Sequence, residues 1–230
     1  MHYYYGFDPL YFLMLAPAFI LAMWAKFRVS STYAEASKIP SNLSGAAAAR
    51  YVLDQAGLND VQVEQIPGQL TDHYDPRQKI LRLSSDVFTG RSLAAVGIAA
   101  HEAGHAIQDA RGYAPLVIRN AAVPAANFGS GFSMILFMIG MIVPSLHVLM
   151  TLGIALFGCV VFFQVVNLPV EFNASTRAKE QLVALGIISP DQLVYVRRVL
   201  DAAAWTYVAA TLQSILTLVY LLMRANDRRN

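Results

Sequence analysis

The chain has 230 residues, of which 56% are hydrophobic and only 14% are charged, with a formal net charge of +2. A soluble domain carries about 25% charged residues, so this deficit predicts an integral membrane protein, and the small net charge without a long basic patch argues against nucleic acid as a partner. The single cysteine, Cys159, lies inside an apolar run, which excludes a disulfide framework and a thiolate metal site.

The first apolar run, residues 9–25, is at the short end of what a membrane-spanning helix requires. Lys26 and Arg28 follow this run, whereas a cleaved signal peptide carries its positive charge before the apolar stretch. We therefore expect transmembrane helix 1 at 9–25, retained as an anchor.

The polar region 28–119 is expected to form a small α+β domain. Ser41 or Ser44 can cap a helix that ends at Gly57. The alternating residues 61–66 predict a strand, and residues 69–84 predict a hairpin that turns at Asp75-Pro76.

A second helix of this region is expected to begin after Ser92, which can cap it, and to run to about Ala110, before Gly112. Beyond the region, the uncharged runs 121–143 and 146–168 flank a short turn and predict transmembrane helices 2 and 3 as a hairpin.

The run 202–223 is long enough for transmembrane helix 4, although polar residues are scattered through it. A hairpin of two spans returns the chain to the side it left, so the segment 169–201 is expected on the same side of the membrane as 28–119. Lys and Arg are concentrated in these two regions, which predicts that both are cytoplasmic. The arginines at the C-terminus oppose this orientation if the fourth run spans completely: Arg224, Arg228 and Arg229.

Residues 101–105 read His-Glu-Ala-Gly-His and carry the main chemical signal of the chain. On a helix, His101 and His105 share one face and can present two imidazoles to one metal ion, while Glu102 lies beside that ion. Zinc held by two His and one carboxylate keeps a position open for water and lowers the pKa of that water to about 7. The alternative interpretation is a surface helix that carries two His by chance.

The segment 169–201 is expected to supply the third ligand and to complete the zinc site. Glu171 is the preferred candidate, in a helix that we expect to start near Pro169. Ser175, four residues later, shares the face of Glu171 and could orient a ligand, and Asn173 could form a hydrogen bond nearby. The alternatives are that Glu171 only complements a helix dipole and that His73 is the third ligand, whereas Glu180 is expected on a solvated face.

Three ordered segments together resemble one known family: LTDHYDPRQKILRLS at 70–84, AAHEAGHAIQ at 99–108 and NLPVEFNAS at 167–175. The chain resembles the YugP-like neutral zinc metallopeptidases, bacterial membrane gluzincins related to the CAAX prenyl protease and HtpX type, over nearly its whole length.

This resemblance implies a gluzincin-like protease domain in the bacterial cell membrane with one zinc ion per chain. His101, His105 and Glu171 would be its ligands, and Glu102 would be the catalytic base. Asn173 stands where the resemblance implies an Asp, which affects a hydrogen bond near the site but none of the ligands.

Two further roles are left open by the sequence. An exposed edge strand could pair with an extended peptide substrate, and the candidate residues for it are Gln69, Leu70, Thr71, Asp72, His73 and Tyr74. The alternative is that this strand is already paired on both edges. The developing oxyanion could be stabilised by one of four side chains: His73, Tyr74, Arg177 or Arg198.

The leading hypothesis is a membrane-embedded zinc endopeptidase that acts on a protein or peptide substrate. Membrane lipid is an expected partner, and glycines in the apolar runs could pack against a membrane partner or a second copy of the chain. An intramembrane protease is disfavoured because charged residues, Arg91 and Asp109, flank the helix that carries the two His. An inactive or scaffolding membrane protein that binds clients is disfavoured because the carboxylate of Glu102 is retained.

Overall fold

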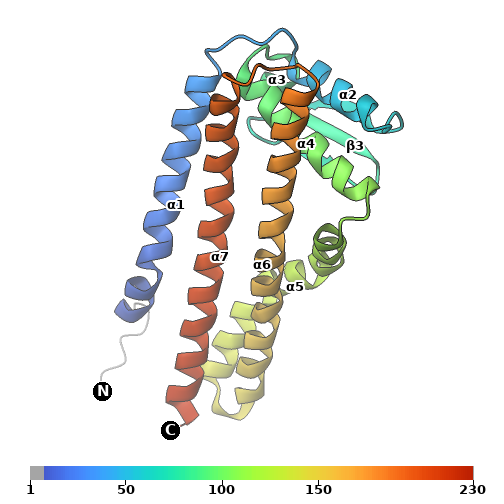
Figure 1. Ribbon diagram of the computed structural model, residues 1–230. Coiled ribbons are helices and arrows are strands. Elements are labelled where there is room, and N and C mark those ends of the chain that lie inside the picture. Colours follow the sequence, from blue (N-terminus) through green and yellow to red (C-terminus); the bar gives the residue numbers. More distant parts are fainter. Residues whose placement is uncertain (1–7, 230) are drawn as a thin grey trace. The chain divides into compact units, whose positions relative to one another are not determined.

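The computed structural model describes residues 8–229, which are mainly helical and include one small sheet (Figure 1). The helices are α1 (Pro9–Ala36), α2 (Gly45–Gln55), α3 (Ser85–Thr89), α4 (Leu93–Ala110), α5 (Ala114–Ile142), α6 (His147–Ala184) and α7 (Leu193–Arg229), and a short 3-10 helix, η1, spans Pro144–Leu146. The strands are β1 (Gln62–Ile66), β2 (His73–Asp75) and β3 (Ile80–Ser84).

The chain divides into two compact units. The first comprises the described residues of Met1–Trp24, Ile118–Leu168 and Thr206–Asn230, and the second comprises Ala25–Val117 and Pro169–Trp205. The first unit contains most of the apolar helical sequence. The second contains the sheet and nearly all of the two polar segments, 28–119 and 169–201, that are expected on one side of a membrane.

Four helices are long and apolar enough to cross a membrane: Pro9–Ala36, Ala114–Ile142, Pro144–Ala184 and Leu193–Asp227. Within the most apolar 18-residue window of each, only 11% to 28% of the residues are buried by other parts of the protein. Apolar side chains that the protein leaves uncovered over such lengths are solvated by lipid. The prediction of a mainly α-helical membrane protein with four membrane helices and a short sheet is confirmed.

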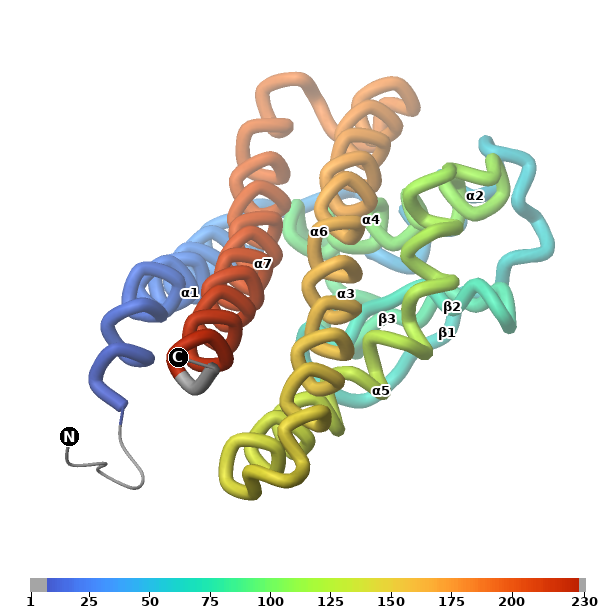
Figure 2. Tube along the Cα trace, turned by 90° about the horizontal axis from the view of Figure 1, so that it is seen from below, coloured from blue at the N-terminus to red at the C-terminus, as the bar shows by residue number. Residues whose placement is uncertain are grey.

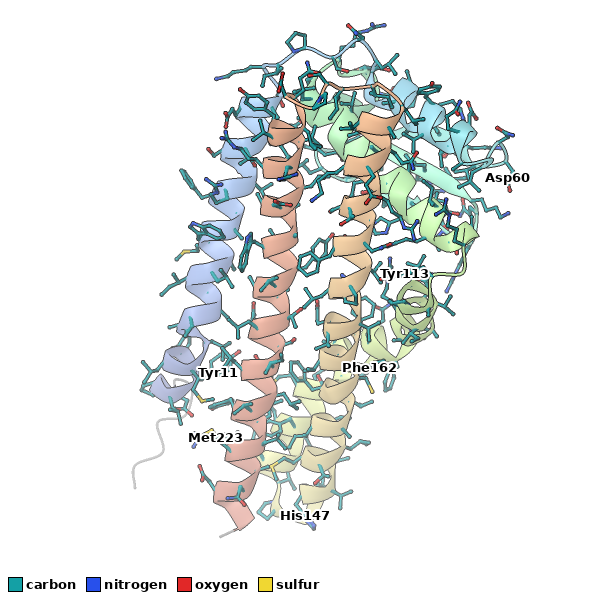
Figure 3. All side chains as sticks on the ribbon, viewed as in Figure 1. Tyr11, Asp60, Tyr113, His147, Phe162 and Met223 are labelled. Carbon is teal, nitrogen blue, oxygen red and sulfur yellow. The ribbon has the colours of Figure 1, made fainter. Side chains whose placement is uncertain are left out.

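The first unit includes a tight hairpin formed by α5 and α6, with His147 labelled at its tip in Figure 3. A Cβ atom at Gly140 would lie 2.3 Å from the backbone nitrogen of Met150, and one at Gly153 would lie 2.5 Å from the carbonyl oxygen of Ser133. These two glycines therefore bring α5 and α6 into backbone contact, a packing role inside the chain.

Helix α6 differs from the expectation in one important respect. No new helix starts near Pro169, because α6 continues through Pro169 from His147 to Ala184. A proline inside a helix removes one backbone hydrogen bond, the one to the carbonyl four residues earlier, and long apolar helices tolerate this loss. Glu171 therefore lies within a long helix and is not a first-turn residue.

The second unit contains the three strands, which lie close together in Figure 2 and pair in the order β1-β3-β2. β1 pairs with β3 in parallel and β2 pairs with β3 antiparallel. Asp75 accepts hydrogen bonds from the backbone nitrogens of Arg77 and Gln78, which closes the predicted turn between β2 and β3.

Helix α4 forms the centre of the second unit. The Ser92 side chain accepts a hydrogen bond from Ala95 and caps the helix as predicted, and Gly112 follows the helix end with φ of 59°. Ser44 caps α2 in the same way, by accepting from Ala47. Buried apolar residues of α2, β3, α4, α6 and α7 form one core, and this core holds α4 rigidly.

Candidate metal centre

The His-Glu-Ala-Gly-His motif lies in the second half of α4, as predicted. His101 and His105 are one helical turn apart, with their ring centroids separated by 4.8 Å. Both imidazoles are largely shielded from solvent, with side-chain exposures of 14% and 10%. The helix therefore presents two histidine nitrogens to one sheltered point.

Glu171 of α6 reaches the same point. Its Oε2 atom lies 3.2 Å from Nε2 of His101 and 3.6 Å from Nε2 of His105, and its side chain is only 8% exposed. Within residues 8–229 these three residues are the single group of His, Cys, Asp and Glu side chains whose ligand atoms converge, all within 4.8 Å of one another. The structure thus brings the three predicted ligands together across 70 residues of sequence.

The spacing of these atoms fits a tetrahedral zinc ion. Zinc bonds to nitrogen and oxygen of about 2.0–2.1 Å place neighbouring ligand atoms about 3.3–3.4 Å apart, close to the separations of Glu171 Oε2 from the two histidine nitrogens, 3.2 and 3.6 Å. Two His and one carboxylate are also a usual donor set for a catalytic zinc, which keeps its fourth position free. The residues present therefore fit the metal that the motif predicts.

Each histidine is held through its second ring nitrogen. The Ser175 Oγ atom lies 3.1 Å from Nδ1 of His101, so Ser175 occupies the orienting position expected from the sequence. Oε1 of Gln108 lies 3.0 Å from Nδ1 of His105. With Nδ1 engaged in both rings, Nε2 is the nitrogen that faces Glu171 in each case.

Gln108 is a site residue that the sequence analysis missed. It lies three residues after His105 on α4, is fully buried, and its Nε2 donates to the carbonyl of Val170 at 2.8 Å and to Oδ1 of Asn173 at 3.0 Å. A glutamine three residues after a helical histidine lies on the same face of the helix. This spacing is the sequence signal that indicates a contact between Gln108 and His105.

Gly104, between the two histidines, is a second residue that the sequence analysis missed. A Cβ atom there would lie 2.7 Å from the carbonyl oxygen of Ala174, so α4 and α6 meet at backbone contact. Glycine costs about 1 kcal/mol relative to alanine inside a helix, and its presence there is a signal of close approach. This contact sets the separation between the helix of the histidines and the helix of Glu171.

Glu102 is 8% exposed and lies on α4 beside the histidines. Burial raises the pKa of Glu102, although the nearby charges of His101 and His105 act in the opposite direction. Burial acts to lower the pKa of His105, but the hydrogen bond to Glu171 and the negative charge of Glu102 outweigh it, so this pKa is raised. Two carboxylates and two imidazoles in a shielded space form an environment that a divalent cation stabilises.

Three of the four side chains proposed to stabilise the oxyanion have other partners. The Tyr74 hydroxyl donates to Asp109 at 3.0 Å, and Arg198 pairs with Glu35 at 3.1 Å. Arg177 donates from Nε to Oδ1 of Asn173 at 2.7 Å, and its guanidinium lies 6.0 Å from the ring of Tyr113, which is labelled in Figure 3.

Two alternatives for the third ligand lie elsewhere in the second unit. His73 is exposed, with Nδ1 2.9 Å from the carbonyl oxygen of Thr71, and does not belong to the converging group. Glu180 is exposed, as expected for a solvated face. The geometry favours Glu171 over both.

The candidate substrate strand is shorter than expected. Of the residues 69–74, only His73 and Tyr74 are in β2, because Leu70 has φ of 53° and the Asp72 carboxylate turns back to accept from the nitrogen and hydroxyl of Ser84. The expectation of a strand over 69–72 is therefore wrong. β2 is nevertheless an edge strand of the described sheet, paired only with β3, so the alternative that it is paired on both edges is also wrong.

Comparison with known proteins agrees with the motifs. A family model described as "Putative neutral zinc metallopeptidase" matches residues 11–226. The "Putative membrane protease YugP" of Bacillus subtilis (strain 168) is 46% identical over 216 residues, which cover 93% of this chain and 96% of that relative. No solved structure matches the chain. The similarity thus extends over the polar segments and the apolar helices alike.

Proposed function

Since the chain belongs to the neutral zinc metallopeptidase family, whose model spans residues 11–226, we propose that it is a membrane-embedded zinc endopeptidase with one catalytic zinc per chain. The observation that carries this proposal is the convergence of His101, His105 and Glu171 within 4.8 Å, with Glu102 on the same helix. These three side chains would hold the metal. When bound there, zinc supplies a Lewis acid that lowers the pKa of water and polarises a peptide carbonyl.

In the proposed reaction Glu102 acts as general base and then as general acid. Its carboxylate takes a proton from the attacking water as the water oxygen bonds to the scissile carbonyl carbon. The carbon–nitrogen bond then breaks, and Glu102 returns the proton to the departing amine. The shielded position of Glu102 on α4 supports this role, because burial raises its pKa and so strengthens it as a base.

Ser175 and Gln108 would act by orienting the imidazoles and not by touching substrate. The free edge of β2 is the proposed site for pairing with an extended peptide backbone, since Tyr74 connects this strand to α4 through Asp109.

We propose a cytoplasmic location for the catalytic unit in a bacterial cell membrane. The hairpin of α5 and α6 returns the chain to the side that α5 left, and the short η1 turn between them carries no Lys or Arg. Lys and Arg are instead frequent in residues 26–119 and 177–198, which the positive-inside rule assigns to the cytoplasm.

The test is a comparison of Glu102→Gln with the unmutated protein in detergent, measuring zinc content and cleavage of casein. Gln retains the shape of the side chain but has no basic carboxylate, so hydrolysis is expected to fall at least about 10²-fold while the zinc content is unchanged. Glu180→Gln, which changes an exposed glutamate of α6, is the matched control and should cleave normally.

Two outcomes would contradict the mechanism. Loss of zinc in the Glu102→Gln protein would make Glu102 a ligand. Full activity with zinc retained would assign the base to another residue, and His73 would be examined first. A zinc-loaded unmutated protein that cleaves no protein or peptide would favour a client-binding scaffold.

A further inference from the structure

We propose that Gln108 is a positioning residue that fixes the tautomer of His105, so that Nε2 of His105 carries a lone pair for the metal before the metal binds. This inference rests on the proposed function in taking zinc as the metal. It assigns a role to a side chain that neither the motif nor the ligand geometry requires.

The side-chain amide of Gln108 has three partners. Its Nε2 atom faces two oxygens, the Val170 carbonyl at 2.8 Å and Oδ1 of Asn173 at 3.0 Å. Its Oε1 atom lies 3.0 Å from Nδ1 of His105. The side chain is fully buried, so water cannot replace any of these partners.

These partners determine which end of the Gln108 amide is the oxygen and which is the NH₂ group. A backbone carbonyl such as that of Val170 can only accept a hydrogen bond, so the amide group facing it must be the NH₂. Asn173 adds to this, because its own oxygen accepts from Nε of Arg177 at 2.7 Å, and a guanidinium can only donate. The oxygen of the Gln108 amide is thereby directed at His105.

The orientation of the amide in turn determines the proton position on His105. An amide oxygen accepts and cannot donate, so Nδ1 of His105 must carry the proton. In a neutral imidazole the other nitrogen then holds the lone pair. That nitrogen is Nε2, the atom 3.6 Å from Oε2 of Glu171. His105 thus donates from Nδ1 to Gln108, and Gln108 donates in turn to Val170 and Asn173, which leaves the lone pair on the metal-facing nitrogen.

The second histidine lacks this constraint. The partner of Nδ1 in His101 is the hydroxyl of Ser175, at 3.1 Å. A hydroxyl can rotate to donate or to accept, so it orients the ring without fixing the tautomer. The Glu171 carboxylate lies 3.2 Å from Nε2 of His101 and can only accept, so in the metal-free protein it favours a proton on that nitrogen. The two histidines are thus predicted to differ, with the proton on Nδ1 in His105 and on Nε2 in His101.

The first measurement uses the unmutated, metal-free protein. Nitrogen NMR of ¹⁵N-labelled histidine, recorded in detergent at a pH where the imidazoles are neutral, distinguishes a protonated ring nitrogen from one with a lone pair. The signals of each residue are identified by their loss in His105→Gln and His101→Gln. We expect His105 with Nδ1 protonated, and a tautomer mixture at His105 would overturn the proposal. This result does not depend on catalysis or on zinc.

The second measurement is zinc affinity, obtained by competition with a chromophoric chelator. Gln108→Met has a similar volume but no polar atoms at the amide, and we expect it to weaken zinc binding by about 10–100-fold, as for other residues that orient metal ligands. Gln108→Glu keeps an oxygen that accepts from Nδ1 of His105 and should retain the affinity. Gln55→Met and Gln55→Glu, at an exposed glutamine of α2, are the matched controls.

The pair of Gln108 variants separates positioning from packing. Both lose the NH₂ that joins α4 to Val170 and Asn173, so a role limited to joining the helices predicts equal loss of zinc affinity in Gln108→Met and Gln108→Glu. That result would overturn the proposal, as would normal affinity in a folded Gln108→Met protein. If the unmutated protein binds no zinc, the proposed function fails, while the tautomer measurement still tests Gln108.

Discussion

Gly104→Ala is the substitution that best tests whether the contact between α4 and α6 sets the metal geometry. The new methyl group would lie 2.7 Å from the carbonyl oxygen of Ala174 and 3.3 Å from the carbonyl carbon of the same residue. Both contacts are with the backbone of α6, which cannot rotate away as a side chain can. The two helices must therefore move apart between His101 and His105, one residue before His105.

The size of this movement follows from the contact distance. Ordinary contact begins at 3.4 Å, so the helices must separate by about 0.7 Å, whereas metal sites keep their ligand distances within about 0.2 Å. Glu171 is only three residues before Ala174 on α6, so its carboxylate shares the displacement. We expect zinc affinity to fall by about 10-fold or more, or about 1.4 kcal/mol.

The stability of the metal-free protein is a less decisive measurement. Overpacking costs about 1–3 kcal/mol, but alanine gains about 1 kcal/mol over glycine in a helix, so the two effects partly cancel. Zinc affinity by chelator competition is the assay to use. Gly158→Ala, also on a long helix but with no atom within 4 Å of the new Cβ, is the control and should bind zinc normally. Unchanged affinity in Gly104→Ala would refute the argument.

Three further predictions concern the ligands, an orienting residue and a helix cap. His101→Ala and His105→Ala should abolish zinc binding, and Glu171→Ala should weaken it far more than Glu180→Ala in metal analysis; equal effects would mean that the carboxylate is wrongly assigned. Ser175→Ala removes the hydroxyl 3.1 Å from His101 and should lower zinc affinity by about 10-fold, with Thr176→Ala, an exposed neighbour, as its control. Ser44→Ala removes the cap of α2 and should lower the free energy of unfolding by about 1 kcal/mol in denaturant titration without changing zinc affinity; a zinc defect there would indicate long-range effects of local stability.

The parts of the fold that the sequence predicted are those with a local physical cause. Ser44 and Ser92 cap helices because a hydroxyl at that position satisfies a free backbone nitrogen. The Asp75-Pro76 pair turns the chain for a similar reason. Glu171 was reached by a less local argument, since a hairpin of two spans must return to the side of the two histidines.

The parts that the sequence did not predict depend on contacts between distant elements. Pro169 predicted a helix start because proline lacks a backbone donor, but the apolar helix before it and the helix after it are continuous, and α6 continues through it. The conformation of Leu70 and the hydrogen bonds of Asp72 to Ser84 delay the start of β2 to His73. Gln108 carried only a weak local signal, its spacing of three residues from His105, because its hydrogen bonds to Val170 and Asn173 connect two distant helices.

The continuity of α6 also explains why a membrane anchor and a metal centre belong to one chain. Phe162 is 52% exposed on this helix, in the part that is long and apolar enough to span a membrane, and Glu171 follows about 13.5 Å further along the axis. The third candidate ligand is thus carried by the same helix as an apolar stretch. The first two ligands are fixed separately, by the core around α4 and by the contact at Gly104. A complete set of candidate ligands therefore requires α4 and the C-terminal part of α6 to pack together within the second unit.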